Sequence, residues 1–241
     1  NQIIDEEEIE NNVFCKIVKD HTLIEEDPRC DLGWMPPKHD KFHDPIFESE
    51  DEIIPFSLRE AILSFIISNA VRNLRGDINE HKTMLIHVTK YKLVQEKVYK
   101  QVTEQIERYR DTILGEDETK RQLMLDKMRE IWEKNFLSHQ KQYPNIKYPT
   151  WDNLVQDEKG FKWIISEISK NIKTLNSDSK DELNYDEFYE KWKYGLNTIV
   201  IGGDKLSRGL TLEGLSVSYF LRSSTMPMYD TLMQMGRWFG Y

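Results

Sequence analysis

The sequence predicts an α/β protein built on a parallel sheet. Four short segments, at residues 82–89, 172–175, 198–201 and 216–221, have the apolar, largely β-branched composition of buried strands. Segments with helical periodicity alternate with these strands, which is typical of parallel sheets. Polar residues follow three of the strands directly. Since ligands of open α/β sheets bind at the carboxyl ends of the strands, we expect a site at that edge.

Residues 1–56 predict an N-terminal extension and a proline-rich connector. The first 19 residues alternate acidic runs with apolar residues, which fits a helix or the tail of one. Residues 28–55 contain five prolines and little periodicity, which indicates an extended connector with turns. Cys30, His39 and His43 lie in this connector, and the two histidines have the spacing of metal ligands. No second cysteine lies nearby, so we favour solvated loop histidines and expect no metal site.

Five helices follow from the periodicity of apolar residues between the strands. The first, at residues 57–74, starts with Ser57 and Glu60 at the spacing of a capping box, and its broad apolar face predicts a buried helix. The others are expected at residues 91–109, 119–136, 151–170 and 185–194. His87, inside the first strand, is more often a satisfied core residue than a catalyst.

The polar strand ends supply the candidate binding residues. Thr89 and Lys90 end the first strand, and Asn176 follows the second. The third strand runs into a glycine-rich cationic loop, a common way to hold phosphate. The loop residues that we single out are Gly202, Gly203, Asp204, Lys205, Ser207, Arg208 and Gly209. The simpler alternative is a tight turn with a solvated lysine and arginine.

A last helix is expected at residues 231–238, after a turn at Gly214 and the fourth strand. Asp230 suits its N-cap, and the helix carries Gln234 and Arg237. Taken with the glycine-rich loop, this helix favours contact with phosphate or nucleic acid. Arg237 also has a structural alternative, an ion pair with an acidic neighbour.

Two stretches resemble known motifs. IVIGGDKLSRGLTLEGL resembles motif V of superfamily-2 helicases, and DTLMQMGRWFGY resembles their motif VI. The sequences of both stretches are more similar still to the Z1-domain family, whose members are described as candidate endonucleases. Those proteins accompany a superfamily-2 helicase module, often in phage defence. Motif VI departs from the helicase pattern: Gln234 lies one residue nearer Gly236, and Gly240 stands where a second arginine is expected.

The resemblance implies that residues 57–241 form the second RecA-like domain of a nucleic-acid-dependent ATPase. Such a domain has helices on both faces of its sheet, and here a helical insertion is expected at about residues 100–170. Arg237 and Gln234 would act on the nucleotide phosphates, and the loop from Gly202 to Gly209, with Thr89 and Asn176, would contact nucleotide or nucleic acid. ATP and Mg²⁺ would be held with a first RecA-like domain, because this chain contains no G-x-x-x-x-G-K-[ST] phosphate loop. We therefore expect a fragment that binds no cofactor alone.

Composition limits the alternatives. The net charge is −9 and the pI is near 5.3, so nucleic-acid contact requires either a local basic strip or a partner domain. The family resemblance implies DNA as the favoured nucleic acid. Two cysteines and no long apolar run indicate a cytoplasmic protein without a membrane partner. The best carboxylate set for a nuclease, Asp111 with Glu118, lies at a helix boundary beside Lys120 and is a weak metal site. The other hypothesis is a non-enzymatic, degenerate RecA-like module that binds proteins.

Overall fold

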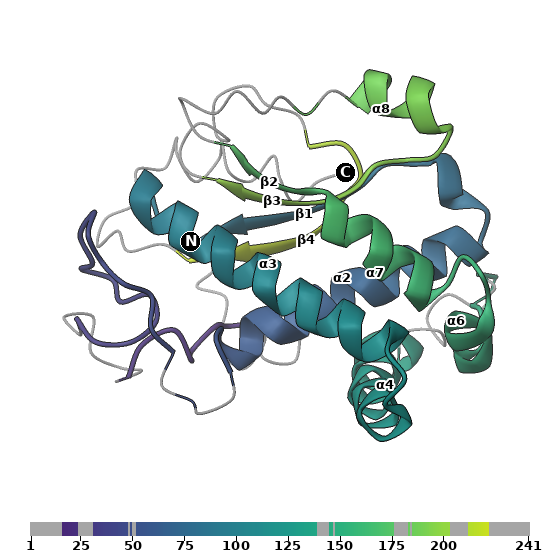
Figure 1. Cartoon of the computed structure of the whole chain (residues 1–241), viewed down its shortest axis with the longest axis horizontal. Helices are drawn as coiled ribbons and strands as arrows, with labels where there is room; N and C mark the ends of the chain where they lie inside the picture. Colours follow the sequence, from purple (N-terminus) through teal and green to yellow (C-terminus); the bar gives the residue numbers. More distant parts are fainter. Residues whose placement is uncertain are drawn as a thin grey trace.

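The computed structural model contains one sheet of four parallel strands. It describes residues 16–23, 31–47, 49, 52–138, 145–146, 148–175, 183, 185–202 and 212–221. The strands are β1 (Lys82–His87), β2 (Ile172–Leu175), β3 (Asn197–Gly202) and β4 (Leu215–Phe220), and their order is β2-β3-β1-β4 (Figure 1). All three strand pairs are parallel. The predicted parallel α/β sheet is therefore confirmed, with all four strands close to their expected positions.

One helix precedes β1, and the other described helices lie between β1 and β2 and between β2 and β3. The described helices are α2 (Phe56–Leu74), α3 (Lys92–Leu114), α4 (Glu118–Trp132), α6 (Trp151–Gln156), α7 (Phe161–Lys170) and α8 (Tyr185–Trp192). A 3₁₀ turn, η1 (Asp77–Asn79), precedes β1, and a π-helical turn, η2 (Glu133–Leu137), extends α4. No helix within these described ranges is long and apolar enough to cross a membrane.

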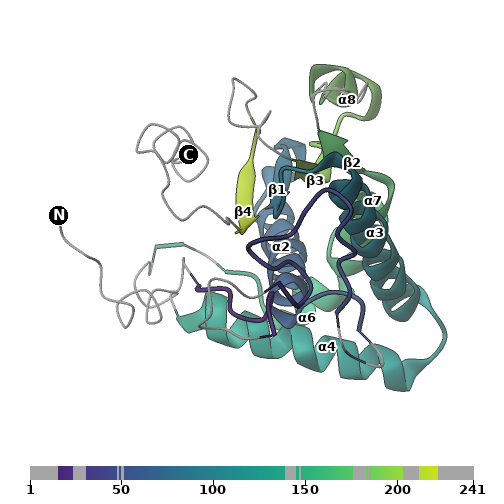
Figure 2. The ribbon, with the colours of Figure 1, turned by 90° about the vertical axis from the view of Figure 1, so that its left-hand side faces the viewer.

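The main core lies on one face of the sheet. Side chains alternate along a strand, so Met84 and Ile86 of β1 point to the same face as Ile199 and Ile201 of β3. Helices α2, α3 and α7 cover this face, and α4 and α6 pack beyond them (Figures 1 and 2). These four strand residues are fully buried, and burial of such side chains stabilises a fold by about 1.5–3 kcal/mol each.

The other face of the sheet is contacted by α8 among the described helices. Leu85 and Val200 point to that face and belong to a second, smaller apolar cluster. Tyr185, at the start of α8, reaches the same face, because its hydroxyl lies 3.2 Å from the Thr83 hydroxyl. Helices are thus present on both sides of the sheet, but the large apolar layer belongs to one side.

The helix expected at residues 151–170 is two helices. Helix α6 starts with a capping box between Thr150 and Asn153 and ends at Gln156. The chain then turns, and α7 starts after Gly160. A Cβ at Gly160 would lie 2.2 Å from the carbonyl oxygen of Leu154, so the turn requires glycine.

The capping box expected at Ser57 and Glu60 is wrong. Helix α2 begins one residue earlier, at Phe56, and a carboxylate from the N-terminal extension occupies its first turn. Asp20 accepts hydrogen bonds from the Ser57 amide (2.8 Å) and the Ser57 hydroxyl (2.5 Å). Glu60 instead accepts a hydrogen bond from Lys16. The helix dipole favours a carboxylate at this end, so Asp20 performs the capping role.

The described part of the N-terminal extension packs into the main core. Trp34 and Met35 are almost completely buried there, and Ile54 is fully buried. Residues 31–47 contain turns but no helix or strand, as the prolines predict. Residues 16–19 are not helical, and residues 1–15, where the rest of the first expected helix falls, lie outside the described residues. The described part of the connector is thus irregular in backbone but packed against the core.

Candidate functional site at the carboxyl edge of the sheet

The carboxyl ends of three strands lie side by side, and we call this end of the sheet its carboxyl edge. Leu175 of β2 pairs with Gly202 of β3, and Ile201 pairs with Ile86, next to His87 of β1. The segments that follow β1, β2 and β3 therefore leave the sheet from neighbouring positions. The carboxyl ends of these strands thus lie at a common edge, which faces the viewer in Figure 2.

Two of the predicted site residues, Thr89 and Gly202, are described by the structure. The others lie outside the described residues: Asn176, Gly203, Asp204, Lys205, Ser207, Arg208, Gly209, Gln234 and Arg237. The last expected helix, at residues 231–238, is outside them too. Gly214, by contrast, is described and does form a turn, with a φ of 64°.

Gly202 ends β3 on the face of the sheet away from the main core. The same row of this face carries Leu175 on one side, and His87 and Phe220 on the other. The His87 and Phe220 rings pack together, with centroids 4.8 Å apart. His87 is buried, in keeping with its expected role as a core residue. Gly202 contributes no side chain to this row and is itself buried.

Thr89 is buried rather than exposed on the edge. Only 4% of its surface is accessible, and its backbone carbonyl accepts a hydrogen bond from Gln95 (2.9 Å). Its hydroxyl lies 2.6 Å from Nε2 of His39 and also accepts a hydrogen bond from the Tyr91 amide (3.2 Å). Thr89 therefore fixes the start of the β1–α3 connection, and a ligand would reach its neighbour Lys90 first.

The hydrogen bonds of His39 define its protonation state. Its Nδ1 lies 2.6 Å from the carbonyl oxygen of Pro36, which can only accept, so Nδ1 carries the proton. Neutral Nε2 then accepts from the Thr89 hydroxyl. Burial lowers the pKa of His39 below its ordinary value, which keeps this neutral form in place. Both ring nitrogens are thus engaged within the protein, and His39 has no nitrogen left for a metal.

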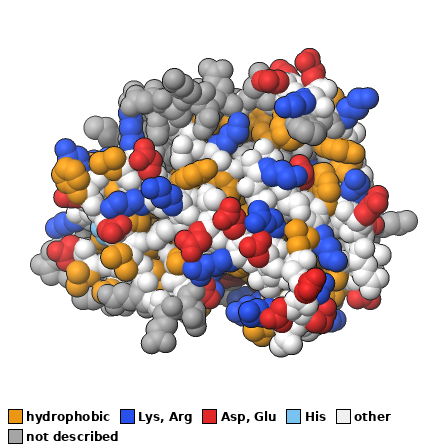
Figure 3. Space-filling model, in the orientation of Figure 1, with side chains coloured by type: hydrophobic (Ala, Val, Ile, Leu, Met, Phe, Trp, Pro, Cys, Tyr) orange, Lys and Arg blue, Asp and Glu red, His pale blue; other side chains and the backbone are white. Residues whose placement is uncertain are grey.

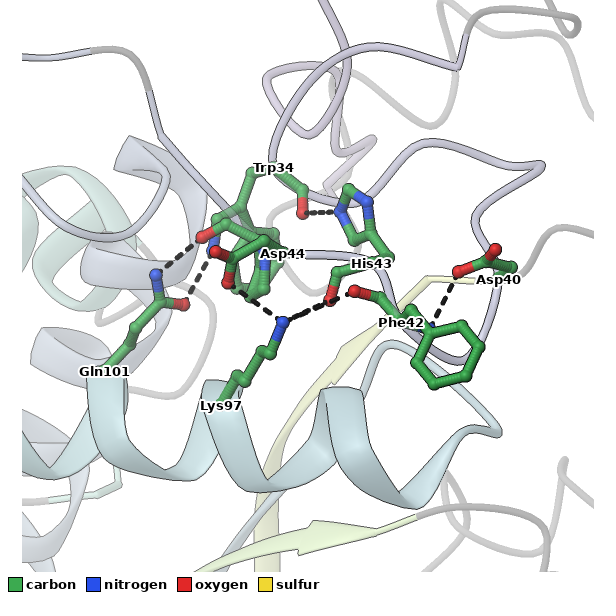
Figure 4. Close-up of polar contacts among 8 residues, drawn as sticks. Trp34, Asp40, Phe42, His43, Asp44, Lys97 and Gln101 are labelled. Carbon is green, nitrogen blue, oxygen red and sulfur yellow. Dashed lines mark hydrogen bonds and ion pairs between the residues drawn. The ribbon is translucent and has the colours of Figure 1, made fainter.

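A polar cluster that the sequence did not predict holds residues 34–45 against α3. Gln101 joins two points of this segment: its Oε1 accepts from Nε1 of Trp34 (3.0 Å), and its Nε2 donates to the Pro45 carbonyl (2.6 Å). One turn earlier, Lys97 donates to the His43 carbonyl (3.0 Å) and pairs with Asp44 (3.1 Å), as Figure 4 shows. The only sequence signal for this contact is the four-residue spacing of Lys97 and Gln101, which places them on one face of the helix.

Metal chemistry has little support among the described residues. His43 uses Nε2 to donate to the carbonyl of Trp34 (2.9 Å). Asp111 pairs with the neighbouring Arg110, and Lys120 pairs with Asp117, the N-cap of α4. No group of three or more His, Cys, Asp or Glu side chains in the described part of the chain is arranged to hold a metal ion.

The comparison with protein families supports the Z1-domain part of the sequence resemblance. The search of curated proteins and the search of solved structures each gave no match. The family model of the Z1 domain matches residues 57–241, from the start of α2 through the last strand and beyond. The match covers well over half of the chain, and we conclude that this chain belongs to the Z1 domain family.

Proposed function

We propose that this chain supplies the second RecA-like domain of a nucleic-acid-dependent ATPase. In this proposal the carboxyl edge of the sheet contacts nucleic acid and nucleotide phosphate. The single observation that carries it is the strand register, which brings the ends of β1, β2 and β3 to adjacent positions. Parallel sheets bind ligands at such an edge, because the connecting segments there converge around the ends of several strands.

The chemistry proposed for this edge comes from the residues that follow the strands. Lys205 and Arg208 lie in the segment after β3, and Arg237 lies further along the chain, after β4. Cations of this kind can stabilise the charge that develops on a transferring phosphoryl group. ATP and Mg²⁺ would be gripped by a first RecA-like domain that carries a phosphate loop, and this chain would complete the site from the other side. The setting proposed from the family resemblance is phage defence or restriction.

The test of this proposal is the DNA-stimulated ATPase rate of protein that contains both RecA-like domains. An arginine that stabilises the transition state is worth roughly a thousandfold or more in turnover, so we expect Arg237→Ala to reduce the rate by about that factor. Arg110→Ala is the matched control, because Arg110 lies on α3 and forms an exposed ion pair with Asp111. Unchanged turnover in Arg237→Ala would remove Arg237 from the mechanism.

The proposal also predicts that the 241-residue chain alone neither hydrolyses ATP nor cuts DNA. Hydrolysis requires a phosphate loop, which the sequence lacks. Robust ATPase activity of the isolated chain would overturn the domain assignment. If protein with both domains showed no nucleic-acid-dependent activity, the alternative would be a non-enzymatic module that binds other proteins.

A further inference from the structure

A surface of exposed lysines, with one exposed and one half-buried aromatic ring, adjoins the carboxyl edge of the sheet. It is formed by two segments that are distant in sequence, and we call it the basic–aromatic surface. Its residues are Lys38, Lys41 and Phe42 of the connector, and Lys90 and Tyr91 of the β1–α3 connection. All three lysines are exposed, and Phe42 is 67% exposed. In Figure 3, hydrophobic and basic side chains lie next to each other, with some acidic ones between, on the left-hand side that carries these segments.

The bridge from His39 to Thr89 joins the two segments into one surface. The hydrogen bond at 2.6 Å places the residues around His39 next to those that follow Thr89. The His39 ring also packs edge-on against Tyr91, with ring centroids 5.6 Å apart. Because His39 lies between Lys38 and Lys41 in sequence and touches Tyr91 in space, both pairs of cations and rings occupy one part of the molecule.

The loop that carries Phe42 is held in place by hydrogen bonds. The Phe42 amide donates to the Asp40 carboxylate (2.7 Å), and Lys97 donates to the Phe42 carbonyl (3.4 Å). Figure 4 shows the Phe42 ring pointing away from the cluster around Gln101 and Trp34. The loop thus presents a large exposed ring to a flat partner, and its backbone has little conformational entropy left to lose on binding.

Each ring of the surface has a lysine ammonium group next to it. Nζ of Lys41 lies 4.8 Å from the centroid of the Phe42 ring, and Nζ of Lys90 lies 5.1 Å from that of Tyr91. Aromatic rings can stack with unpaired bases, and adjacent lysines can neutralise the phosphates between those bases. A duplex does not offer its base faces in this way. On a chain with a net charge of −9, the three lysines of this surface outnumber its exposed carboxylate, Asp40, and this local positive charge favours a polyanion.

We propose that the basic–aromatic surface binds single-stranded nucleic acid, with a base stacked on Phe42 and phosphates held by Lys38, Lys41 and Lys90. The inference rests on the proposed function, because it extends the nucleic-acid path from the carboxyl edge. It assigns this part of the path to the connector, whose residues lie before the part matched by the Z1 family model. The strand would run from the β1–α3 connection across Tyr91 to Phe42.

The test uses fluorescence anisotropy of the whole 241-residue chain with a labelled oligothymidine of about 20 nucleotides, longer than the roughly 4–16 nucleotides that one such site spans. We expect Phe42→Ala to weaken binding about tenfold, the effect of removing the stacking of one base. We expect the double variant Lys41→Gln and Lys90→Gln to flatten the salt dependence. The slope of log K against log salt should fall by about 1.4, or about 0.7 for each phosphate that a lysine no longer neutralises. Binding to a duplex of the same length should be weaker than to the single strand.

Matched controls lie on α4, away from this surface. Leu123 is an exposed apolar residue (60%), and Lys120 and Lys127 are exposed lysines of the same helix. Leu123→Ala and the double variant Lys120→Gln and Lys127→Gln should leave both affinity and salt slope unchanged. Circular dichroism of each variant checks that the fold is retained.

The outcomes separate this inference from the proposed function. The inference is overturned if the chain does not bind the oligothymidine, binds duplex equally well, or binds a polyglutamate peptide more tightly. It is also overturned if the Phe42 and lysine variants bind like the controls. If Arg208→Ala weakens binding while these variants do not, the carboxyl-edge contact stands without the basic–aromatic surface. The ATPase measurement on Arg237→Ala judges the proposed function independently of all these results.

Discussion

The amino edge of the sheet, where the strands begin, differs from the carboxyl edge, where they end, in the burial of its side chains and the packing of its backbone. At the amino edge, Lys82 is fully buried and donates to the carbonyls of Asp77 (2.8 Å) and Glu80 (2.9 Å) in the turn before β1. Burial lowers the pKa of this lysine to about 8. At the carboxyl edge, Lys90 is exposed beside an aromatic ring. A lysine is thus buried and hydrogen-bonded at the amino edge, whereas a lysine is exposed to solvent at the carboxyl edge.

Close backbone contacts reinforce this difference at the amino edge. The carbonyl of Gly214 accepts a hydrogen bond from the Thr83 amide (3.1 Å), and the Gly195 amide donates to the carbonyl of Ile78 (3.1 Å). Nδ1 of His81 accepts a hydrogen bond from the Leu196 amide (2.9 Å). These contacts leave little room for a ligand. The comparison indicates that the amino edge is closely packed, whereas the carboxyl edge leaves Lys90 exposed to solvent.

The largest expected effect is that of Gly214→Ala. Gly214 has a φ of 64°, and a Cβ there would lie 1.8 Å from the carbonyl oxygen of His81. Left-handed strain and a backbone collision together should lower the free energy of unfolding by about 3 kcal/mol or more, measured by urea denaturation.

Two other glycines separate the cost of the left-handed backbone from the cost of the collision. Gly76 has a φ of 102° but no atom within 4 Å of its added Cβ, so Gly76→Ala isolates the cost of the backbone conformation. Gly195 has the collision without a positive φ, since its added Cβ would lie 1.9 Å from the carbonyl oxygen of Glu80. We expect Gly76→Ala to lower the free energy of unfolding by about 1 kcal/mol, and Gly195→Ala to lower it by more. If Gly214→Ala lost no more than Gly76→Ala, the amino edge would not be as closely packed as the structure shows.

An intermediate effect is expected from pH, because both edges contain a histidine whose pKa is lowered. Burial is the main cause for His81 at the amino edge, for His39 at the carboxyl edge, and for His21 in the extension. Just below pH 6.5 the unfolded chain therefore binds more protons than the folded one. The free energy of unfolding should be unaffected by these groups above about pH 7.5 and should fall as pH is lowered from there to about pH 5.

Single variants assign this pH dependence to the two edges. His81→Gln and His39→Gln should each reduce the slope of stability against pH, because each removes one titrating group. The lowered pKa of Glu60 does not interfere in this range, because its contribution is lost only below its ordinary value of 4.5. A flat stability profile in the parent chain between about pH 7.5 and about pH 5 would contradict the burial of these histidines.

The sequence predicted the sheet well because each strand is specified by its own residues. β1, β2, β3 and β4 are short apolar segments whose character is visible without any tertiary contact. The break between α6 and α7 was missed because Leu154 and Phe161 are seven residues apart, two helical turns, so the periodicity continues across the break.

The candidate site was less predictable because its contacts join irregular segments. The bond from Asp20 to Ser57 and the bond from His39 to Thr89 span 37 and 50 residues, respectively. A proline-rich connector has no periodic pattern, so its sequence does not predict which of its residues will contact a given strand end. Thr89 was correctly placed at a strand end, but its burial under His39 depends on that unpredictable contact.

The smallest expected effect on stability is that of Phe42→Ala, at the carboxyl edge. The ring is 67% exposed, so its removal returns little apolar surface to water, and we expect a change in the free energy of unfolding within about 0.5 kcal/mol. Phe65 of α2 is the matched comparison, because it is fully buried in the main core. Phe65→Ala should lower the free energy of unfolding by about 3–5 kcal/mol.

Urea denaturation of both variants measures the contrast. Phe42 keeps its backbone hydrogen bonds to Asp40 and Lys97 when the ring is removed, so the loop should hold its position. A loss well above 1 kcal/mol in Phe42→Ala would mean that the ring supports the fold. In that case its weaker binding to nucleic acid would no longer indicate that a base stacks on the ring. A neutral result would leave an exposed aromatic ring that the fold does not need, on a hydrogen-bonded loop beside lysines at the edge where the strands end.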